Sequence, residues 1–379
     1  MRILIASAVL AAAVAATSAG AHTSVPALPP TSDLVAAKKH FLDVAERGVE
    51  RARTLWWNER LGWYDESLYS HWHQPLLMLW SAYQLFNAVN GVALADPSPA
   101  NIRAVRKFAN GAEAYFNPAV KPGGAYAYYP HYTDTAIRYY FDDNGWFGIA
   151  YMDAYRVTHD RRYLQDALKA FRFLDRAGWD AKRGGFWWDT YHEHKTSEPL
   201  AAAILIGVRI YEATHDRSYL HKALRWLAWA HAHSWNRRRG LYQRSATDNL
   251  VMSYVEGLMA AANAEACAVT RQRSYCRRAE LVARNAVRAF GVNLHWSPRY
   301  DAVYLYGLLN LYARDHASSW YALTYHNALR ALSTQNDRGL FLLSWSGEQK
   351  GDDTRLKDLG LDAASLSVFA WLAASRLPT

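Results

Sequence analysis

Two kinds of helical pattern alternate along most of the chain. In one kind, charged and apolar residues alternate at helical spacing, as in residues 161–177, which indicates a helix with a single buried face. In the other kind, small and apolar residues run nearly all round the helix, as in residues 201–207 and 258–262. A helix of the second kind must be buried on every side. The alternation therefore predicts an outer and an inner layer of helices.

The pattern predicts twelve helices joined in pairs. The outer helices are expected at about residues 33–58, 101–116, 161–177, 217–235, 274–291 and 319–333. The inner helices are expected at about residues 73–89, 143–158, 199–214, 249–270, 300–315 and 362–375. Turns rich in glycine and aromatic residues lead from each outer helix to the next inner helix, so we expect these turns to gather at one end and line a cleft.

A segment of the chain recurs at a fixed distance. Residues 155–164 return as residues 211–220, an offset of 56 residues that equals one helix pair. A fixed period of this size is typical of stacked or circularised helical hairpins. The His-Asp steps in both copies are expected to form a turn and an N-cap rather than a catalytic site. Closing six hairpins into a ring predicts an all-α fold, an (α/α)6 toroid, with one catalytic domain over residues 33–379.

The composition suits a large folded core that also binds flat ligands. Hydrophobic residues make up 51% and charged residues 20% of the 379 residues, which excludes an intrinsically disordered chain. The 16 Trp and 25 Tyr exceed what packing alone requires, and many stand beside glycine in the predicted turns. Some of these rings will fill the core, whereas rings in a cleft suit the C–H faces of sugars.

The formal charge of +9 raises the question of an anionic partner. Lys and Arg are spread along the predicted helices, and the one dense run, Arg237 to Arg239, adjoins Gly240 in a turn. We therefore expect no nucleic-acid partner. The sequence has no phosphate loop, dinucleotide fingerprint or Gly-x-Ser-x-Gly elbow, which argues against kinases, dehydrogenases and esterases. We expect the protein to be a monomer.

The first residues have the pattern of a secretory signal. Arg2 precedes an apolar run, and Ala19-Gly20-Ala21 fits the small-residue cleavage site. We expect a signal peptide at residues 1–21, cleavage after Ala21, a leader at residues 22–32, and export to the periplasm or the extracellular space without a membrane span. In such a compartment Cys267 and Cys276 form either a disulfide or two buried thiols.

Two adjacent carboxylates, Asp142 and Asp143, stand at the predicted start of the fourth helix. Breaking a glycosidic bond usually takes two carboxyl groups, one to protonate the leaving oxygen and one to attack the sugar or activate water. Inside a helix these neighbours would point about 100° apart. We therefore expect Asp142 in the preceding loop and Asp143 as the helix cap, with repulsion raising one pKa. From these residues alone, an acidic cap on a solvated helix remains an alternative.

The sequence around this pair resembles glycoside hydrolase family 76, whose members are mostly exported α-1,6-mannanases on an (α/α)6 toroid. Residues 142–148, followed by Asp153-Ala154-Tyr155-Arg156, are similar to the catalytic helix of the family, and residues 184–189 are similar to its Gly-Gly-x-Trp-Trp-Asp turn. The resemblance implies endo-acting cleavage of α-1,6-mannan by retaining double displacement. It implies Asp142 as the nucleophile, Asp143 as the general acid/base, and no metal or other cofactor.

Two departures from the family pattern concern the sugar. Residues 196–200 replace an Asn-x-x-x-Asn segment, and Tyr254-Val255-Glu256-Gly257 replaces Tyr-Asn-Gln-Gly. Amides at these positions would bind sugar hydroxyls, so Glu198 and Glu256 suggest, alternatively, a charged or amino sugar. The residues expected to bind substrate are Tyr64, His71, Trp72, Trp188, Asp189, Glu198, Tyr254, Glu256 and Asp301.

Metal chemistry and other functions receive less support from the sequence. Three His-x-His pairs occur, but this spacing puts the two rings on different faces of a helix, and no cluster of acids or cysteines completes a site. Because one fold hosts several functions, two alternatives remain. One is another toroid enzyme: a hydrolase of a different α-glycan, an epimerase or a uronide hydrolase. The other is a glycan-binding envelope protein without turnover.

Overall fold

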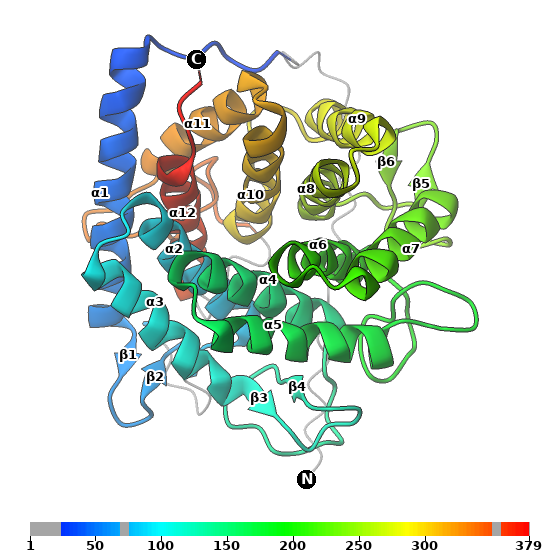
Figure 1. Ribbon diagram of the computed structural model, residues 1–379. Helices are drawn as coiled ribbons and strands as arrows, with labels where there is room; N and C mark the ends of the chain where they lie inside the picture. The colour runs from blue at the N-terminus through cyan, green and yellow to red at the C-terminus, as the bar shows by residue number, and fades with distance from the viewer. Residues whose placement is uncertain (1–23, 69–75, 351–357, 379) are drawn as a thin grey trace.

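The computed structural model describes residues 24–68, 76–350 and 358–378, and Figure 1 shows their helices in two concentric layers. The inner helices are α2 (Leu79–Ala95), α4 (Phe141–Thr158), α6 (Ser197–Thr214), α8 (Ser253–Thr270), α10 (Pro298–Asp315) and α12 (Asp358–Ala374). The outer helices are α1 (Thr31–Leu55), α3 (Pro99–Ala112), α5 (Arg161–Phe173), α7 (Arg217–His233), α9 (Arg273–Phe290) and α11 (Ser318–Leu332). Two short turns, η1 (Glu113–Tyr115) and η2 (Leu174–Gly178), extend α3 and α5.

The inner helices form a closed ring. Each packs against the next in chain order, and α12 packs against α2, so the last hairpin meets the first. Helix α1 contacts both α12 and α2 and covers this junction. The architecture is the (α/α)6 toroid that the helical pattern predicts.

Burial explains the two layers. In α6 every residue from Ser197 to Ile210 is buried, whereas α9 buries Ala279, Val282, Ala283 and Ala286 along one face. Inner helices also approach one another closely where glycine allows it. A Cβ added at Gly307 would lie 2.2 Å from the backbone of Gly257, so the crossing of α8 and α10 requires glycine at these two positions.

Short antiparallel hairpins join outer to inner helices. They are β1 (Trp57–Asn58) with β2 (Trp63–Tyr64), β3 (Phe116–Asn117) with β4 (Ala125–Tyr126), and β5 (Trp235–Asn236) with β6 (Leu241–Tyr242). The fourth residue of the following inner helix holds some of these turns. Asn144 accepts the Tyr126 N–H and Glu256 accepts the Tyr242 N–H, each at 2.8 Å. Helices α4 and α8 therefore start beside these turns.

The opposite end carries tight turns. His159 and His215 end α4 and α6 in the left-handed conformation, with φ of 54° and 58°. The next residues, Asp160 and Asp216, cap α5 and α7 by accepting backbone N–H groups. The predicted turn and cap at the two His-Asp steps are confirmed.

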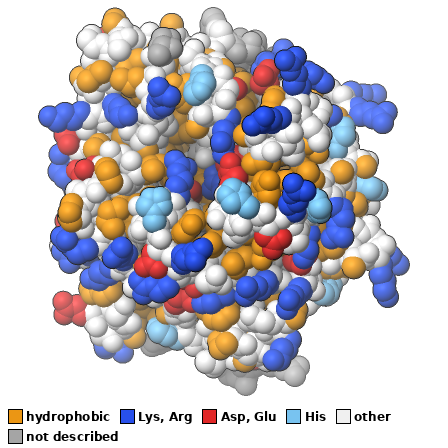
Figure 2. Space-filling view, in the orientation of Figure 1, with side chains coloured by type: hydrophobic (Ala, Val, Ile, Leu, Met, Phe, Trp, Pro, Cys, Tyr) orange, Lys and Arg blue, Asp and Glu red, His pale blue; other side chains and the backbone are white. Residues whose placement is uncertain are grey.

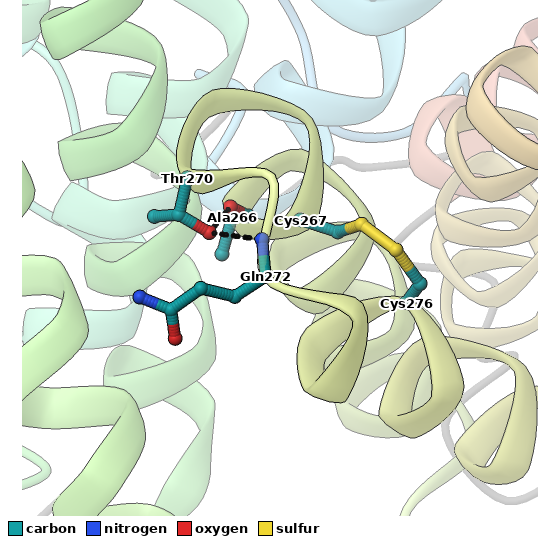
Figure 3. Close-up of a disulfide and its surroundings, with 5 residues drawn as sticks. All are labelled: Ala266, Cys267, Thr270, Gln272 and Cys276. Atoms are coloured by element: carbon teal, nitrogen blue, oxygen red, sulfur yellow. Dashed lines mark hydrogen bonds between the residues drawn. A yellow bond between two sulfur atoms is a disulfide. The ribbon is translucent and has the colours of Figure 1, made fainter.

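The two cysteines form a disulfide between α8 and α9. Cys267 and Cys276 are joined across the short connecting turn, with their Cα atoms 5.2 Å apart (Figure 3). In the same turn Thr270 Oγ1 donates to the Ala266 carbonyl and accepts the Gln272 N–H. Of the two alternatives left by the sequence, the structure contains the disulfide.

The main boundary difference concerns α2, which begins at Leu79 and not near residue 73. Before it, Leu76 and Leu77 are extended and pair with Asp65 and Tyr64. The helix also continues to Ala95, because Gly91 is a contact with α12 and not a helix end: a Cβ there would lie 2.8 Å from that of Ala370.

The surface and the helices give two further findings. On the face seen in Figure 2, Lys and Arg side chains are interspersed with acidic and hydrophobic ones. Among the helices of the described residues, none is long and apolar enough to cross a membrane.

Candidate active site

Asp142 and Asp143 are the second and third residues of α4. This differs from the expectation that Asp142 lies in the loop and Asp143 caps the helix, because the helix begins earlier, at Phe141. Tyr140 is the N-cap residue, makes no side-chain cap, and pairs with Asp189 in an isolated bridge. The Phe141 N–H donates to the Trp188 carbonyl at 2.8 Å, which fixes the start of α4 against the preceding turn.

The Asp142 carboxylate accepts two hydrogen bonds. The Trp188 Nε1–H donates to Oδ2 at 3.1 Å, and the Asp143 N–H donates to Oδ1 at 3.1 Å. Burial raises the pKa of Asp142 to about 6, while these donors oppose the rise because they favour the charged form. Asp142 is half-buried, so it can both ionise near neutral pH and contact a ligand.

Asp143 is more deeply buried than Asp142. Its side chain is 7% exposed. Burial is the largest cause that raises the pKa values of Tyr128 and Tyr140, and the charge of Asp143 raises both further. The charge of Asp142 also raises the pKa of Tyr140, so both aspartates act on this ring.

A third carboxylate, Glu198, occupies on α6 the position that Asp142 occupies on α4. Tyr254 has the same position on α8, again 56 residues further along the chain, and its Oη donates to Glu198 Oε1 at 3.4 Å. Thr196 Oγ1 donates to Glu198 Oε2. Burial raises the pKa of Glu198 to about 7; Arg244 opposes this rise and the charge of Asp142 adds to it. The repeat thus brings Asp142, Glu198 and Tyr254 together around the ring.

Arg244 supplies the positive charge of this cluster. It lies in the loop between β6 and α8, and its Nε is 3.5 Å from Glu198 Oε1. Its charge also lowers the pKa of Asp142, against the larger effect of burial. We call Asp142, Asp143, Glu198 and Arg244 the charged cluster.

Two sets of aromatic rings adjoin the charged cluster, one through Tyr254 and the other through Trp188. One set contains Trp80, Trp146, Tyr254, Tyr300 and Trp296, and the other contains Tyr128, Tyr129, Tyr132, Tyr140 and Trp188. In the first set Trp296 and Tyr300 stack at 4.2 Å, and Trp296 is 38% exposed. Such rings suit the apolar faces of sugars.

Four of the residues expected to bind substrate have structural contacts. Tyr64 is buried in β2 beside Trp57 and Trp63. The other three are acids: Asp189 pairs with Arg138 at 3.0 Å, Glu256 is 0% exposed and holds Tyr242, and Asp301 accepts the Trp296 N–H.

The remaining expected residues divide into two groups. Trp188, Glu198 and Tyr254 lie at the charged cluster with the two aspartates. His71 and Trp72 lie outside the described residues.

The sequence reasoning missed Arg244, Thr196 and the aromatic residues Trp80, Tyr140 and Tyr300. Trp80 is the second residue of α2, so the register that relates Asp142 to Glu198 would have pointed to it. Arg244 lies in an irregular loop, for which the sequence carries no comparable signal.

The raised pKa of Asp142 leads to a stability prediction. The pKa of Asp142 in the folded state is about 6, which is above its ordinary value. The free energy of unfolding that Asp142 contributes in its protonated form is therefore lost as pH rises through about 6. At pH 8 the free energy of unfolding of Asp142→Asn should therefore exceed that of the parent by about 2 to 3 kcal/mol, and the variant should unfold at a higher temperature. At pH 4 the two proteins should unfold at nearly the same temperature. Thermal unfolding followed by circular dichroism at both pH values measures this. A variant less stable than the parent at pH 8 would contradict it.

Within residues 24–68, 76–350 and 358–378, no group of three or more His, Cys, Asp or Glu side chains is arranged to hold a metal ion.

Several solved structures are similar to this chain in fold. A family 76 glycoside hydrolase from a bovine Bacteroides thetaiotaomicron strain superposes with a TM-score of 0.78 at 19% identity, covering 88% of this chain and 77% of that one. An α-1,6-mannanase from a Salegentibacter species has a TM-score of 0.69 at 16% identity, covering 86% and 99%. The cellobiose 2-epimerase from Spirochaeta thermophila has a TM-score of 0.64 at 13% identity, covering 91% and 99%.

Comparisons at the level of sequence give the family. A search of curated proteins found no match. The model of the family described as glycosyl hydrolase family 76 matches residues 114–374, a span that holds the charged cluster and more than half of the chain. The protein is a member of glycoside hydrolase family 76.

Proposed function

We propose that the protein hydrolyses α-mannan at internal α-1,6 bonds with retention of configuration, using Asp142 as nucleophile and Asp143 as general acid/base. The observation that carries the proposal is the pair of adjacent aspartates in the first turn of an inner helix, beside aromatic rings and inside the family match.

In the first step, a carboxylate oxygen of Asp142 forms a bond to C1 of the sugar as the bond from C1 to the leaving oxygen breaks. Asp143 gives its proton to that oxygen. The N–H groups of Trp188 and Asp143 both donate to Asp142, which holds its carboxylate in one orientation. Ionised Asp142 is the competent form, so its pKa of about 6 predicts that activity falls as pH decreases below about 6.

In the second step, Asp143 takes a proton from water, whose oxygen bonds to C1 and releases Asp142 as a carboxylate. Two displacements at C1 restore the original configuration. The sugar then leaves, and Asp143 is again protonated for the next cycle.

The choice of mannan rests on relatives. An inactive variant of the Salegentibacter α-1,6-mannanase, in which two adjacent aspartates are replaced by asparagine, is in complex with α-1,6-mannotriose. That structure has a TM-score of 0.72 at 15% identity and covers 88% of this chain and 99% of the other. We transfer the pair of acids and the substrate class as a proposal, because likeness at this identity shows the fold alone.

Product analysis tests the proposal. We expect linear α-1,6-mannan to be cut into a mixture of oligosaccharides early in the reaction, and nuclear magnetic resonance should show α-anomers first. Only monosaccharide at early times would contradict endo action, and β-anomers first would contradict retention. If the protein hydrolysed only another α-glycan, the mannanase assignment would be wrong and the protein would be a different glycoside hydrolase. If the product were an epimerised sugar, the protein would be an epimerase.

We also propose that the protein is exported and acts as a monomer. The signal-like residues 1–21 lie outside the described residues, so the proposal of export rests on their sequence pattern.

A further inference from the structure

We infer that Glu198 and Arg244 together hold two neighbouring hydroxyl groups of a neutral sugar bound against Asp142, and so help to determine substrate specificity. The inference rests on the proposed function, because it assigns a role within the same site. The hairpin repeat carries its first step: Glu198 and Asp142 are equivalent positions on adjacent helices of the inner ring. A sugar placed for attack by Asp142 therefore also meets α6.

The contacts of Arg244 leave hydrogen-bond donors available. Its Nε faces Glu198 at 3.5 Å, and its Nη1 is 3.7 Å from Asp248, beyond hydrogen-bond distance. Within the described part of the chain, its guanidinium makes no ion pair or hydrogen bond with any other side chain. The side chain of Arg244 is 22% exposed, so these N–H groups can reach a ligand.

The contacts of Glu198 also leave room for a ligand. Thr196 holds Oε2, but the two groups that approach Oε1, Tyr254 Oη and Arg244 Nε, are at 3.4 and 3.5 Å. These distances are at the limit of a hydrogen bond, so a sugar hydroxyl can bind Oε1 more closely. Because Glu198 is 3% exposed, that hydroxyl would be largely removed from water.

A carboxylate beside a guanidinium matches a pair of hydroxyl groups. Each hydroxyl can donate its proton to the carboxylate and accept from a guanidinium N–H, and such charge-assisted hydrogen bonds are stronger than neutral ones. The charges also disfavour the alternatives. An anionic sugar would meet Asp142 and Glu198, and an amino sugar would meet Arg244. Glu198 and Arg244 would thus bind the sugar hydroxyl groups that the amides of the family pattern would bind in this region.

The test measures binding without turnover. In an Asp142→Asn parent, the affinity for neutral α-1,6-mannotetraose is measured by isothermal titration calorimetry, alone and with Glu198→Gln, Arg244→Ala or both. We expect each single substitution to lower the affinity by about tenfold to a hundredfold. The affinity of the double variant should be no lower than that of the single variant with the lower affinity. The matched control is Arg238→Ala, an exposed arginine in the turn between β5 and β6, which should bind like the parent.

A monodeoxy series separates contact from folding. Among monodeoxy mannotetraoses, at least one should bind the parent about tenfold more weakly yet bind Arg244→Ala no more weakly than the unmodified sugar does. Single variants that bind within about twofold of the parent would overturn the inference and leave the proposed function intact. A parent that binds no neutral oligosaccharide would overturn it too, and the separate hydrolysis assay would then show whether the proposed function also fails.

Discussion

Asp142→Asn should lower kcat on α-1,6-mannan by about four powers of ten or more, with little change in affinity for the substrate. Without the carboxylate there is no atom to form the bond to C1, while the aromatic rings and Arg244, which we propose to contact the sugar, remain. Asp143→Asn should cost about 10²-fold to 10⁴-fold on mannan, the usual size of general acid catalysis. With a dinitrophenyl glycoside, whose leaving group needs no proton, formation of the glycosyl-enzyme should be much less affected.

Steady-state and burst kinetics on both substrates measure these effects. The matched control is Asp337→Asn, an exposed aspartate in the loop after α11, which should keep the parent rate within about twofold. Asp142→Asn with more than about a tenth of the parent rate would contradict its role as nucleophile. Equal losses for Asp143→Asn on both substrates would contradict its role as acid.

Arg209→Met should destabilise the fold by about 3 to 5 kcal/mol. Arg209 lies in α6 and is surrounded by the inner helices: it donates to Glu265 at 3.0 Å, Asp153 at 3.3 Å, Tyr306 at 2.7 Å and Asn310 at 2.9 Å. Asp153 and Glu265 are 2% and 4% exposed, so the variant would leave two buried carboxylates without their cation. Burial already raises the pKa of Asp153 against the effect of Arg209.

Denaturant unfolding at pH 5 and pH 8 measures the loss. Arg209 opposes the rise in the pKa of Asp153, so without Arg209 that pKa should be higher in the folded state, and the deficit should be larger at pH 8 than at pH 5. Arg314→Ala is the control: it breaks an ion pair with Glu212 whose side chains are 38% and 34% exposed, and should cost at most about 1 kcal/mol. A loss no larger for Arg209→Met than for Arg314→Ala would contradict the account.

The ring of helix pairs could be predicted from the sequence because its causes are local and periodic. Helices buried on every side, such as α6, differ in pattern from helices with one buried face, such as α9. The same pattern placed Asp142 and Asp143 at the start of an inner helix. Family membership was also predictable, because each of the motifs that carry it, residues 142–156 and residues 184–189, is a short continuous segment of the sequence.

The prediction was weaker where function depends on which way a side chain points. Glu198 and Glu256 looked alike as replacements for amides, yet Glu198 is the second residue of its helix and reaches Arg244, while Glu256 is the fourth and holds a hairpin. A difference of two positions turns a side chain by about 200° around a helix. The sequence pattern also did not indicate that Tyr64, in β2, lies against Trp63, or that Asp189 forms an ion pair with Arg138.

The contact between α12 and α2 has a consequence for how the molecule unfolds. In an open array of repeats, the end units have one neighbour each and fray first. A closed ring has no end units, so releasing any hairpin breaks two interfaces at once. Heat or denaturant should therefore open the molecule in one cooperative transition, and damage to any hairpin, near the charged cluster or far from it, should be felt by all of them.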